Sequence, residues 1–238
     1  MYQERFYRDW SLSKFRLEIS YKESDLLIST DRELDKNFVQ DILKKYYSEV
    51  ENYIKKNSVF LTSLSPLEQD DCAPSIIKDM IDCSNVTGIG PFASVAGAIA
   101  LYIGKEILGR ADEVVVENGG DIFLKINEDK HVGVYLGERF ETNNITLKIK
   151  KREYPFGIAS SSAYIGHSLN FGRTDLLTVI AKDAILADGF ATALSNQIKK
   201  EADIKGVLER AKGNSFLEGL IIAFEGKLFF WGDVEVSG

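Results

Sequence analysis

Apolar and polar residues alternate along much of the chain, a pattern that predicts strands buried on one side. Residues 14–30 alternate on either side of a Lys-Glu-Ser-Asp turn, and residues 219–233 alternate about Glu225-Gly226-Lys227. Both stretches predict β-hairpins. We expect residues 131–137 and 145–151 to continue the sheet that 113–126 begins. The remaining strand patterns are 154–162 and 176–181.

Apolar positions three to four residues apart predict helices in the other segments. One of these helices is rich in Ala and Gly; Pro91 suits its first turn and Gly109 its end. Its small side chains would let a neighbouring backbone approach closely. The first predicted helix begins at residues 35–37 and carries an apolar stripe to Tyr53. The others lie around Ser75–Ile81 and at 87–109, Ala184–Ser195 and Ile204–Lys212.

These elements do not alternate regularly as strand, helix, strand, so the pattern favours an α+β fold over a doubly wound α/β fold. We expect a mixed, largely antiparallel sheet with helices packed on it. No Pro- or Ser-rich linker and no low-complexity stretch divides the sequence. Residues 1–238 are therefore expected to form a single compact domain.

The net charge and the apolar content of the chain limit the kinds of partner that it can bind. The formal net charge of −7 argues against general nucleic-acid binding, which needs a dense basic face. A small anionic ligand held by backbone amides and a metal stays compatible with that charge. The sequence has no apolar run of about 18 residues and no apolar signal region at its N-terminus. We expect a cytoplasmic protein with no membrane partner.

The two cysteines, Cys72 and Cys83, lie eleven residues apart with no His near either. That spacing does not match a zinc site, and a reducing cytoplasm disfavours a disulfide. We interpret them as packed or partly buried thiols, with a redox or sulfur-carrying pair as the alternative.

Segment 178–194 places a carboxylate and a hydroxyl on one face of a predicted helix, because Asp188 and Thr192 are four residues apart. Two hard oxygen ligands could hold part of a Mg²⁺ shell and leave other positions to water and substrate phosphate. Alternatively, Asp188 is a charge favoured near a helix start and Thr192 bonds a local carbonyl. The rest of the helix is apolar or small, so we expect a buried carboxylate that needs a partner such as a metal.

Gly119, Gly120 and Asp121 follow a predicted strand, where backbone can approach a ligand closely and a carboxylate follows at once. A tight strand-to-strand turn explains the same residues equally well. The run GIGPFA at 88–93 is a loose version of a dinucleotide fingerprint, but no clear strand precedes it, which disfavours a Rossmann site. Whether this helix N-terminus contacts a phosphate is left open.

A polar segment at 160–175 separates two core strands, and such loops often handle ligands. Within it, His167 could act as a general base because imidazole titrates near neutrality. An exposed His without a role is the alternative. There is no GxSxG nucleophile turn, which argues against a serine hydrolase. The candidate ligand contacts in this segment are Ser160, Ser161, Ser162 and Arg173.

The order of these motifs resembles the ApbE family: GGDI, then an SSS…GH…RT loop, then VIAKDAILADGFATAL. ESDLLIST, GIGPFASVAGAIA and VENGGDI resemble its compact UPF0280 branch more closely, and the likeness runs from about Arg16 to near the end of the chain. The resemblance implies a single ApbE-like domain. It also implies a Mg²⁺-dependent enzyme that binds FAD and moves FMN onto a threonine of an acceptor protein, or hydrolyses FAD.

The resemblance assigns roles to particular residues. Asp188 and Thr192 match the family's metal ligands, and Gly119, Gly120 and Asp121 match its GGD segment beside the flavin. His167 matches the His proposed to help activate the acceptor hydroxyl. Expected partners are therefore a flavin nucleotide or another small phosphorylated ligand and an acceptor protein, with a homodimer as a further expectation.

The sequence also departs from the family pattern. Asn170 stands where the family loop H-x-x-D-P-R-T-G has its acid, and no Pro follows it. Residues 94–97 replace a Lys-Gly pair, and the N-terminal Met-Gly-Thr element is not visible. Two alternatives therefore accompany the enzyme hypothesis. One is a non-catalytic ligand-binding or assembly factor, and the other is a component of sulfide assimilation into homocysteine, a pathway linked to the UPF0280 branch.

Overall fold

A computed structural model describes residues 14–164 and 170–237. They form an eight-stranded sheet in the order β1-β2-β3-β4-β7-β8-β9-β10. Every neighbouring pair is antiparallel. The strands are β1 (Phe15–Tyr21), β2 (Ser24–Thr30), β3 (Val114–Asn118), β4 (Asp121–Lys125), β7 (Phe156–Ser161), β8 (Leu176–Ala181), β9 (Leu217–Phe224) and β10 (Lys227–Gly232).

A second sheet of three strands, ordered β11-β6-β5, packs on one face of the first. Its strands are β5 (Lys130–Tyr135), β6 (Asn144–Ile149) and β11 (Glu235–Ser237). The expectation that 131–137 and 145–151 continue the first sheet is wrong, and β11 was not predicted at all. The reason is packing: apolar residues of β5 and β6, such as Val134 and Leu147, cover Ile158 and Ile180 of the main sheet.

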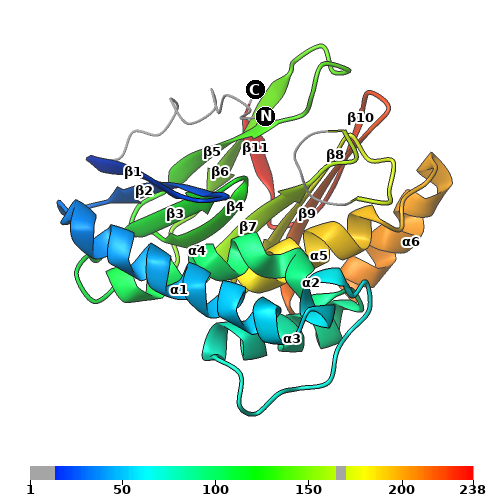
Figure 1. The fold of residues 1–238 in the computed structure, drawn as a ribbon. Coiled ribbons are helices and arrows are strands. Elements are labelled where there is room, and N and C mark those ends of the chain that lie inside the picture. Colours follow the sequence, from blue (N-terminus) through cyan, green and yellow to red (C-terminus); the bar gives the residue numbers. More distant parts are fainter. Residues whose placement is uncertain (1–13, 165–169, 238) are drawn as a thin grey trace.

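Helices cover the other face of the main sheet (Figure 1). In the described part of the chain, no single helix is long and apolar enough to cross a membrane; residues 75–87 and 91–107, bent by 108°, reach that length and composition only as a pair. The helices are α1 (Lys36–Lys56), α2 (Val59–Thr62), α3 (Ser75–Thr87), α4 (Val95–Ile107), α5 (Ala184–Ser195) and α6 (Glu201–Lys212). The α+β class and the largely antiparallel sheet are thereby confirmed.

The predicted helix at 87–109 is divided, and α3 is longer than expected. Gly88 ends α3 in the left-handed conformation, with φ of 78°, which a glycine adopts without steric cost. Pro91 then opens a 3-10 turn that leads into α4. Gly90 packs so closely that a Cβ there would lie 1.7 Å from the carbonyl oxygen of Ser63. The chain reversal at Gly88 and the close packing at Gly90 thus account for both glycines of the GIGPFA run.

The helix α5 lies against β7, and a glycine makes the close contact feasible. A Cβ added at Gly157 would lie 2.4 Å from the backbone nitrogen of Ala184, the first residue of α5. Asp183 caps this end of the helix by accepting a hydrogen bond from the Leu186 amide at 2.8 Å. The start of α5 is therefore fixed directly on the sheet.

Replacing Gly157 by Ala should destabilise the protein by about 1–3 kcal/mol, because the new methyl group overlaps α5 backbone. Gly206 in α6 provides the matched control, since a Cβ there meets nothing within 4 Å. Gly206→Ala should instead stabilise the protein by about 0.5–1 kcal/mol through helix propensity. Urea unfolding measures both. Equal effects of the two substitutions would contradict the proposed packing constraint.

Candidate functional site

Asp188 and Thr192 lie one turn apart on α5, and each residue is only 7% exposed. The helix around them is buried on almost every side, because its other residues are apolar or small. A helix that is apolar all round lies inside a protein, not at its surface. The two polar side chains are therefore interior groups, as the sequence predicted.

Backbone amides of α4 hold the Asp188 carboxylate. The Gly97 amide donates to Oδ2 at 2.9 Å, and the Ala96 amide also hydrogen-bonds the carboxylate. A Cβ at Gly97 would lie 2.8 Å from the Asp188 Cβ and 2.2 Å from the Ala184 carbonyl oxygen. Only a glycine lets α4 approach α5 this closely. The small residues of the predicted 87–109 helix were the sequence signal for this contact.

Burial raises the pKa of Asp188 from 3.8 to about 7, since the charged form loses its hydration. The amides of Gly97 and Ala96 oppose this shift by stabilising the anion. Within the described residues, no cationic side chain forms an ion pair with Asp188. Near neutral pH the ionised form of Asp188 is therefore a buried charge without a described counter-charge.

Gly119 and Gly120 form the two-residue turn between β3 and β4, with φ of 70° and 110°. Positive φ at both positions is the requirement of a type I′ hairpin turn. The Gly120 amide donates to Glu117 Oε1 at 3.0 Å. The tight-turn interpretation of the two glycines is therefore correct, and the turn also sets the direction of Asp121.

Asn118 and Asp121 face each other across this turn. They share a sheet face with Val116 and Phe123, which pack toward the helices. The Asn118 side-chain amide donates to the Ala96 carbonyl at 3.2 Å, next to the Gly97 that holds Asp188. Asp121, only 9% exposed, thus lies on the face and at the end of the sheet where α4 meets α5. Asn118 was not among the residues predicted from the sequence; its place immediately before Gly119 was the available signal.

A buried polar network joins the far end of α5 to β7. The Asn170 side-chain amide donates to Ser161 Oγ and to Ser195 Oγ, both at 2.8 Å. Thr174 Oγ1 shares a hydrogen bond with Ser195 Oγ, and neither of these two residues is exposed to solvent. Asn170 also accepts from the Gly172 amide at 2.6 Å. The Asn170 side chain therefore links its own segment to the ends of β7 and α5, a contact that we call the Asn170 clamp.

The other predicted ligand contacts are dispersed. Ser160 lies on the opposite face of the sheet, where its hydroxyl bonds Thr178 at 2.8 Å. Ser162 is buried, and its Oγ accepts from the Tyr164 amide at 3.0 Å. Arg173 is exposed, and its backbone amide donates to the Ile198 carbonyl at 2.9 Å. His167 lies outside the described residues.

Cys83 is buried beside the site, whereas Cys72 is exposed. The Cys83 thiol donates to the Ile185 carbonyl at 3.3 Å, and a Cβ at Gly189 would lie 2.4 Å from its sulfur. Burial, and secondarily the nearby Asp188, raise its pKa to about 12. Cys83 is therefore a packed thiol that fills space between α3 and α5, in agreement with the first interpretation of the sequence.

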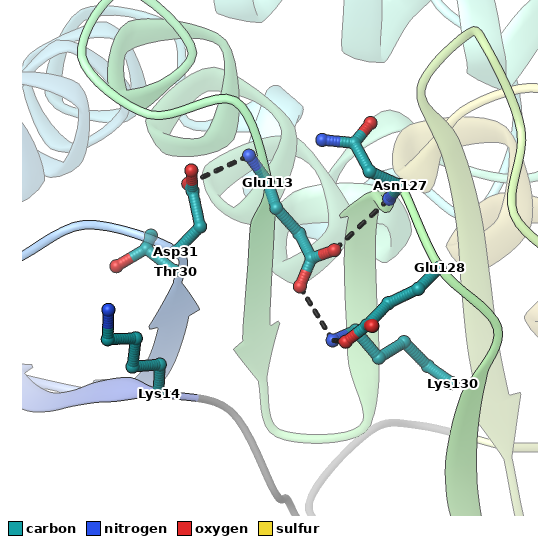
Figure 2. Close-up of a pocket in the computed structure, with 7 residues that line it drawn as sticks. All are labelled: Lys14, Thr30, Asp31, Glu113, Asn127, Glu128 and Lys130. Carbon is teal, nitrogen blue, oxygen red and sulfur yellow. Dashed lines mark hydrogen bonds and ion pairs between the residues drawn. The ribbon is translucent and has the colours of Figure 1, made fainter.

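A charged cavity of about 400 Å³ lies at the opposite end of the sheet (Figure 2). Lys130 Nζ lies 2.7 Å from Glu113 Oε1 and 2.6 Å from Glu128 Oε1. The Asp31 carboxylate accepts from the Glu113 amide at 2.9 Å, and Glu113 accepts from the Asn127 amide. These bonds tie the ends of β2, β3 and β4 together. The cluster is structural, and we assign no ligand to it.

Comparison with known proteins places this architecture in a class. The flavin transferase ApbE of Vibrio cholerae, solved as a variant, superposes with a TM-score of 0.61 at 12% identity, covering 91% of this chain and 96% of that one. The ApbE protein of Thermotoga maritima gives a TM-score of 0.61 at 13% identity over 90% of this chain and 96% of that one. The fold is therefore that of the ApbE proteins.

Proteins related in sequence identify the family within the ApbE fold. A family model described as "AbpE bacteria" matches residues 8–215. A UPF0280 protein of Methanocaldococcus jannaschii is 35% identical over 92% of this chain and 91% of its own length. One of Archaeoglobus fulgidus is 39% identical, with 87% of each chain covered. The chain belongs to the ApbE-like UPF0280 family.

The raised pKa of Asp188 predicts a pH-dependent stability in metal-free protein. Protons favour the folded state, so this contribution is complete below the ordinary pKa of 3.8 and is lost as the pH rises through about 7. The stability of the wild type relative to Asp188→Asn should fall by about 2–3 kcal/mol between pH 5 and pH 8. Urea unfolding in the presence of a chelator measures it.

Glu106→Gln is the control for this experiment. The hydrogen bond from Tyr46, together with Lys45, lowers the pKa of Glu106 from 4.5, so its contribution changes only in more acidic solution. Its stability difference from wild type should stay constant from pH 5 to pH 8. A constant difference for Asp188→Asn as well would contradict the desolvation of Asp188.

Proposed function

We propose that this protein binds a flavin nucleotide together with Mg²⁺ where α4, α5 and the β3–β4 turn meet, and that it transfers FMN to an acceptor protein or hydrolyses FAD. The observation that carries the proposal is the buried Asp188 carboxylate, which has amide donors but no described cationic partner. The flavin part rests on the ApbE flavin transferase of Vibrio cholerae, which shares the fold.

The residues at this point fit a divalent cation. Asp188 and Thr192 offer a carboxylate and a hydroxyl on one helical face, and Asp121 lies at the same end of the sheet. The described residues contain no group of three or more His, Cys, Asp or Glu side chains able to hold a metal. Such a poor side-chain shell suits Mg²⁺, which keeps several positions for water and substrate phosphates.

When bound, the cation would screen the pyrophosphate charge during phosphoryl transfer. The chain's own residues hold and orient the site. Gly97 and Ala96 direct the Asp188 carboxylate through their amides, and Asn118 fixes the β3–β4 turn against the same segment. Ser161 lies at the end of β7 on the helix-covered face, and we propose that it borders the nucleotide. His167 keeps its proposed role in activating the acceptor hydroxyl.

Removal of the Asp188 charge should abolish Mg²⁺-dependent FAD binding. Asp188→Asn keeps an oxygen for the Gly97 amide, so the fold should survive while the metal ligand is lost. Thr192→Val should weaken binding about tenfold, the effect of losing one strong polar contact. Calorimetry with FAD, with and without Mg²⁺, measures affinity, and chromatography measures FMN release.

Asp82→Asn is the matched control, since it makes the same chemical change at an exposed carboxylate of α3. It should bind FAD and Mg²⁺ as the wild type does. The proposal is wrong if wild-type protein gives no heat with FAD and Mg²⁺ and leaves FAD intact. It is also wrong if Asp188→Asn binds both normally.

A second candidate function is ligand binding without turnover, and the Asn170 clamp favours it. The family's acid at this position is replaced by an amide whose donors are both committed to serine hydroxyls. A side chain held in this way serves the scaffold and has no proton to exchange near neutrality. The non-catalytic hypothesis thus rests on a contact that the family's acid could not make in the same form.

Asn170→Asp separates the two functions. An ionised Asp cannot donate to Ser161 or Ser195, so the substitution should destabilise the protein by about 1–3 kcal/mol. If the wild type binds FAD without turnover and Asn170→Asp gains FMN transfer, the non-catalytic function is supported. Robust transfer by the wild type, lost in Asn170→Asp, would contradict it. Thermal unfolding and a flavin-transfer assay together measure these outcomes.

The third hypothesis, a role in sulfide assimilation, gains little from the cysteines. A sulfur carrier needs an accessible thiolate. Cys83 is buried, and its pKa of about 12 keeps it protonated at neutral pH. Only the exposed Cys72 could exchange sulfur directly.

A further inference from the structure

The strand β10 is the last strand of the main sheet, and no described strand pairs with its outer side (Figure 1). It follows β9 through the two-residue turn Glu225-Gly226, whose φ values of 47° and 78° are those of a type I′ hairpin turn. Within residues 14–164 and 170–237, one side of β10 is therefore a free sheet edge.

The side chains of β10 give this edge an apolar and aromatic character. Four consecutive apolar residues, including two phenylalanines and a tryptophan, lie between Lys227 and Gly232. Phe230 is 45% exposed. Proteins commonly protect a free edge with charges, proline or a bulge, because an unprotected apolar edge is a template for pairing with another chain.

The other free edges of the two described sheets carry charged or polar side chains. On β1, Arg16 and Glu18 are exposed. The strand β5 begins with Lys130 and His131, and β11 begins with Glu235. Protection is therefore weakest at β10.

The register of the β9–β10 hairpin determines which backbone groups face outward. Phe224 and Lys227 close the two-residue turn and are therefore a hydrogen-bonded pair. Such pairs alternate with non-bonded pairs along an antiparallel ladder. The amides and carbonyls of Leu228 and Phe230 are consequently directed away from β9, toward the free edge.

Two hydrogen bonds agree with this alternation. The Ala223 carbonyl, opposite Leu228, accepts from the Asp175 amide at 3.0 Å and so faces away from β10. Asp233, an odd number of residues beyond Leu228, donates its amide to the Glu218 carbonyl at 2.8 Å, on the β9 side. The outer edge of β10 thus offers both donors and acceptors to a partner strand.

A second copy of the chain complements this edge. Residues that face each other in an antiparallel pair lie on the same face of the sheet, so a symmetric pairing of β10 with itself is centred on one residue. Centring on Phe230 places Lys227 of one copy opposite Asp233 of the other. These two side chains have opposite charges and are 58% and 57% exposed.

We propose that two copies of the chain pair through β10, antiparallel and about a two-fold axis at Phe230, so that their main sheets form one continuous sheet. The two Phe230 rings then meet on the face that carries the second sheet, and Phe229 meets Trp231 of the other copy on the helix-covered face. The homodimer expected from the family resemblance thereby acquires a defined interface.

This interface is independent of the proposed flavin site, because three strands, β7, β8 and β9, separate β10 from β4. Pairing of one short strand makes a small interface, and small interfaces are weak. We therefore expect a dimer that forms and dissociates with concentration.

Sedimentation of the full chain measures this association. The wild type should approach twice its mass of 26.6 kDa at about 100 µM and return to the monomer on dilution. Phe230→Lys places two like charges opposite each other and should weaken the dimer about a hundredfold. Phe171→Lys is the matched control, since it makes the same change at a phenylalanine that is 50% exposed, and it should dimerise as the wild type does.

A disulfide tests the register in a Cys72→Ser background, which removes the exposed thiol. Phe230→Cys should form a disulfide between two copies, because a hydrogen-bonded antiparallel pair holds its Cα atoms about 5.5 Å apart. In Leu228→Cys the two new thiols should not bond, because four residues along the strand separate their Cα atoms by roughly 14 Å.

Three results would each overturn the proposal. The first is a wild type that stays monomeric at about 100 µM. The second is a folded Phe230→Lys variant that dimerises as well as the wild type. The third is a disulfide that forms as readily in Leu228→Cys as in Phe230→Cys, and this result decides the matter even if Phe230→Lys does not fold.

Discussion

Close backbone packing around α5 is the constraint on which the rest of the structure depends. Glycines permit the approach on three sides of this helix: Gly157 in β7, Gly97 in α4 and Gly189 within α5 itself, against Cys83. At each of these positions a Cβ would fall within 3 Å of a neighbouring atom. The sheet, α4 and α3 are thereby fixed relative to one helix.

This packing creates the chemistry of the candidate site by excluding water. An exposed Asp188 would be an ordinary carboxylate; in contact with the Gly97 amide and away from solvent, its charge is costly. Two backbone amides reduce this cost without removing it, so the pKa of Asp188 stays raised in the native state. Perturbed pKa values of this kind are concentrated at functional sites.

The sequence predicted most elements of the fold because their patterns are strong and local. The terminal hairpins, α1 and α5 follow from periodicity and turn residues close in the chain. The three-stranded sheet could not be predicted, because β5 and β6 look like strands of any sheet and only long-range packing assigns them to a second layer. The close packing of Gly90 on Ser63, next to the point where the predicted 87–109 helix is divided, is another long-range contact.

The candidate site likewise has one part that could be predicted from the sequence and one part that could not. The spacing of Asp188 and Thr192 is local, so their common helical face was predictable. Their link to the β3–β4 turn runs from Gly97 through Ala96 to Asn118 and depends on how α4 docks, which no spacing in one segment reveals. The Asn170 clamp likewise joins a loop, β7 and α5.

Polar residues in a helix that is buried on all sides need an explanation that polar residues on a surface helix do not. On a surface helix, Asp188 and Thr192 would be two of many polar groups and would need no explanation. In α5 they are interior groups among apolar and small neighbours, on the side that receives the amides of α4. The other sides of α5 pack among apolar side chains, which offer no hydrogen-bond donor to a carboxylate. The orientation of α5 therefore places the Asp188 carboxylate against the amides of α4.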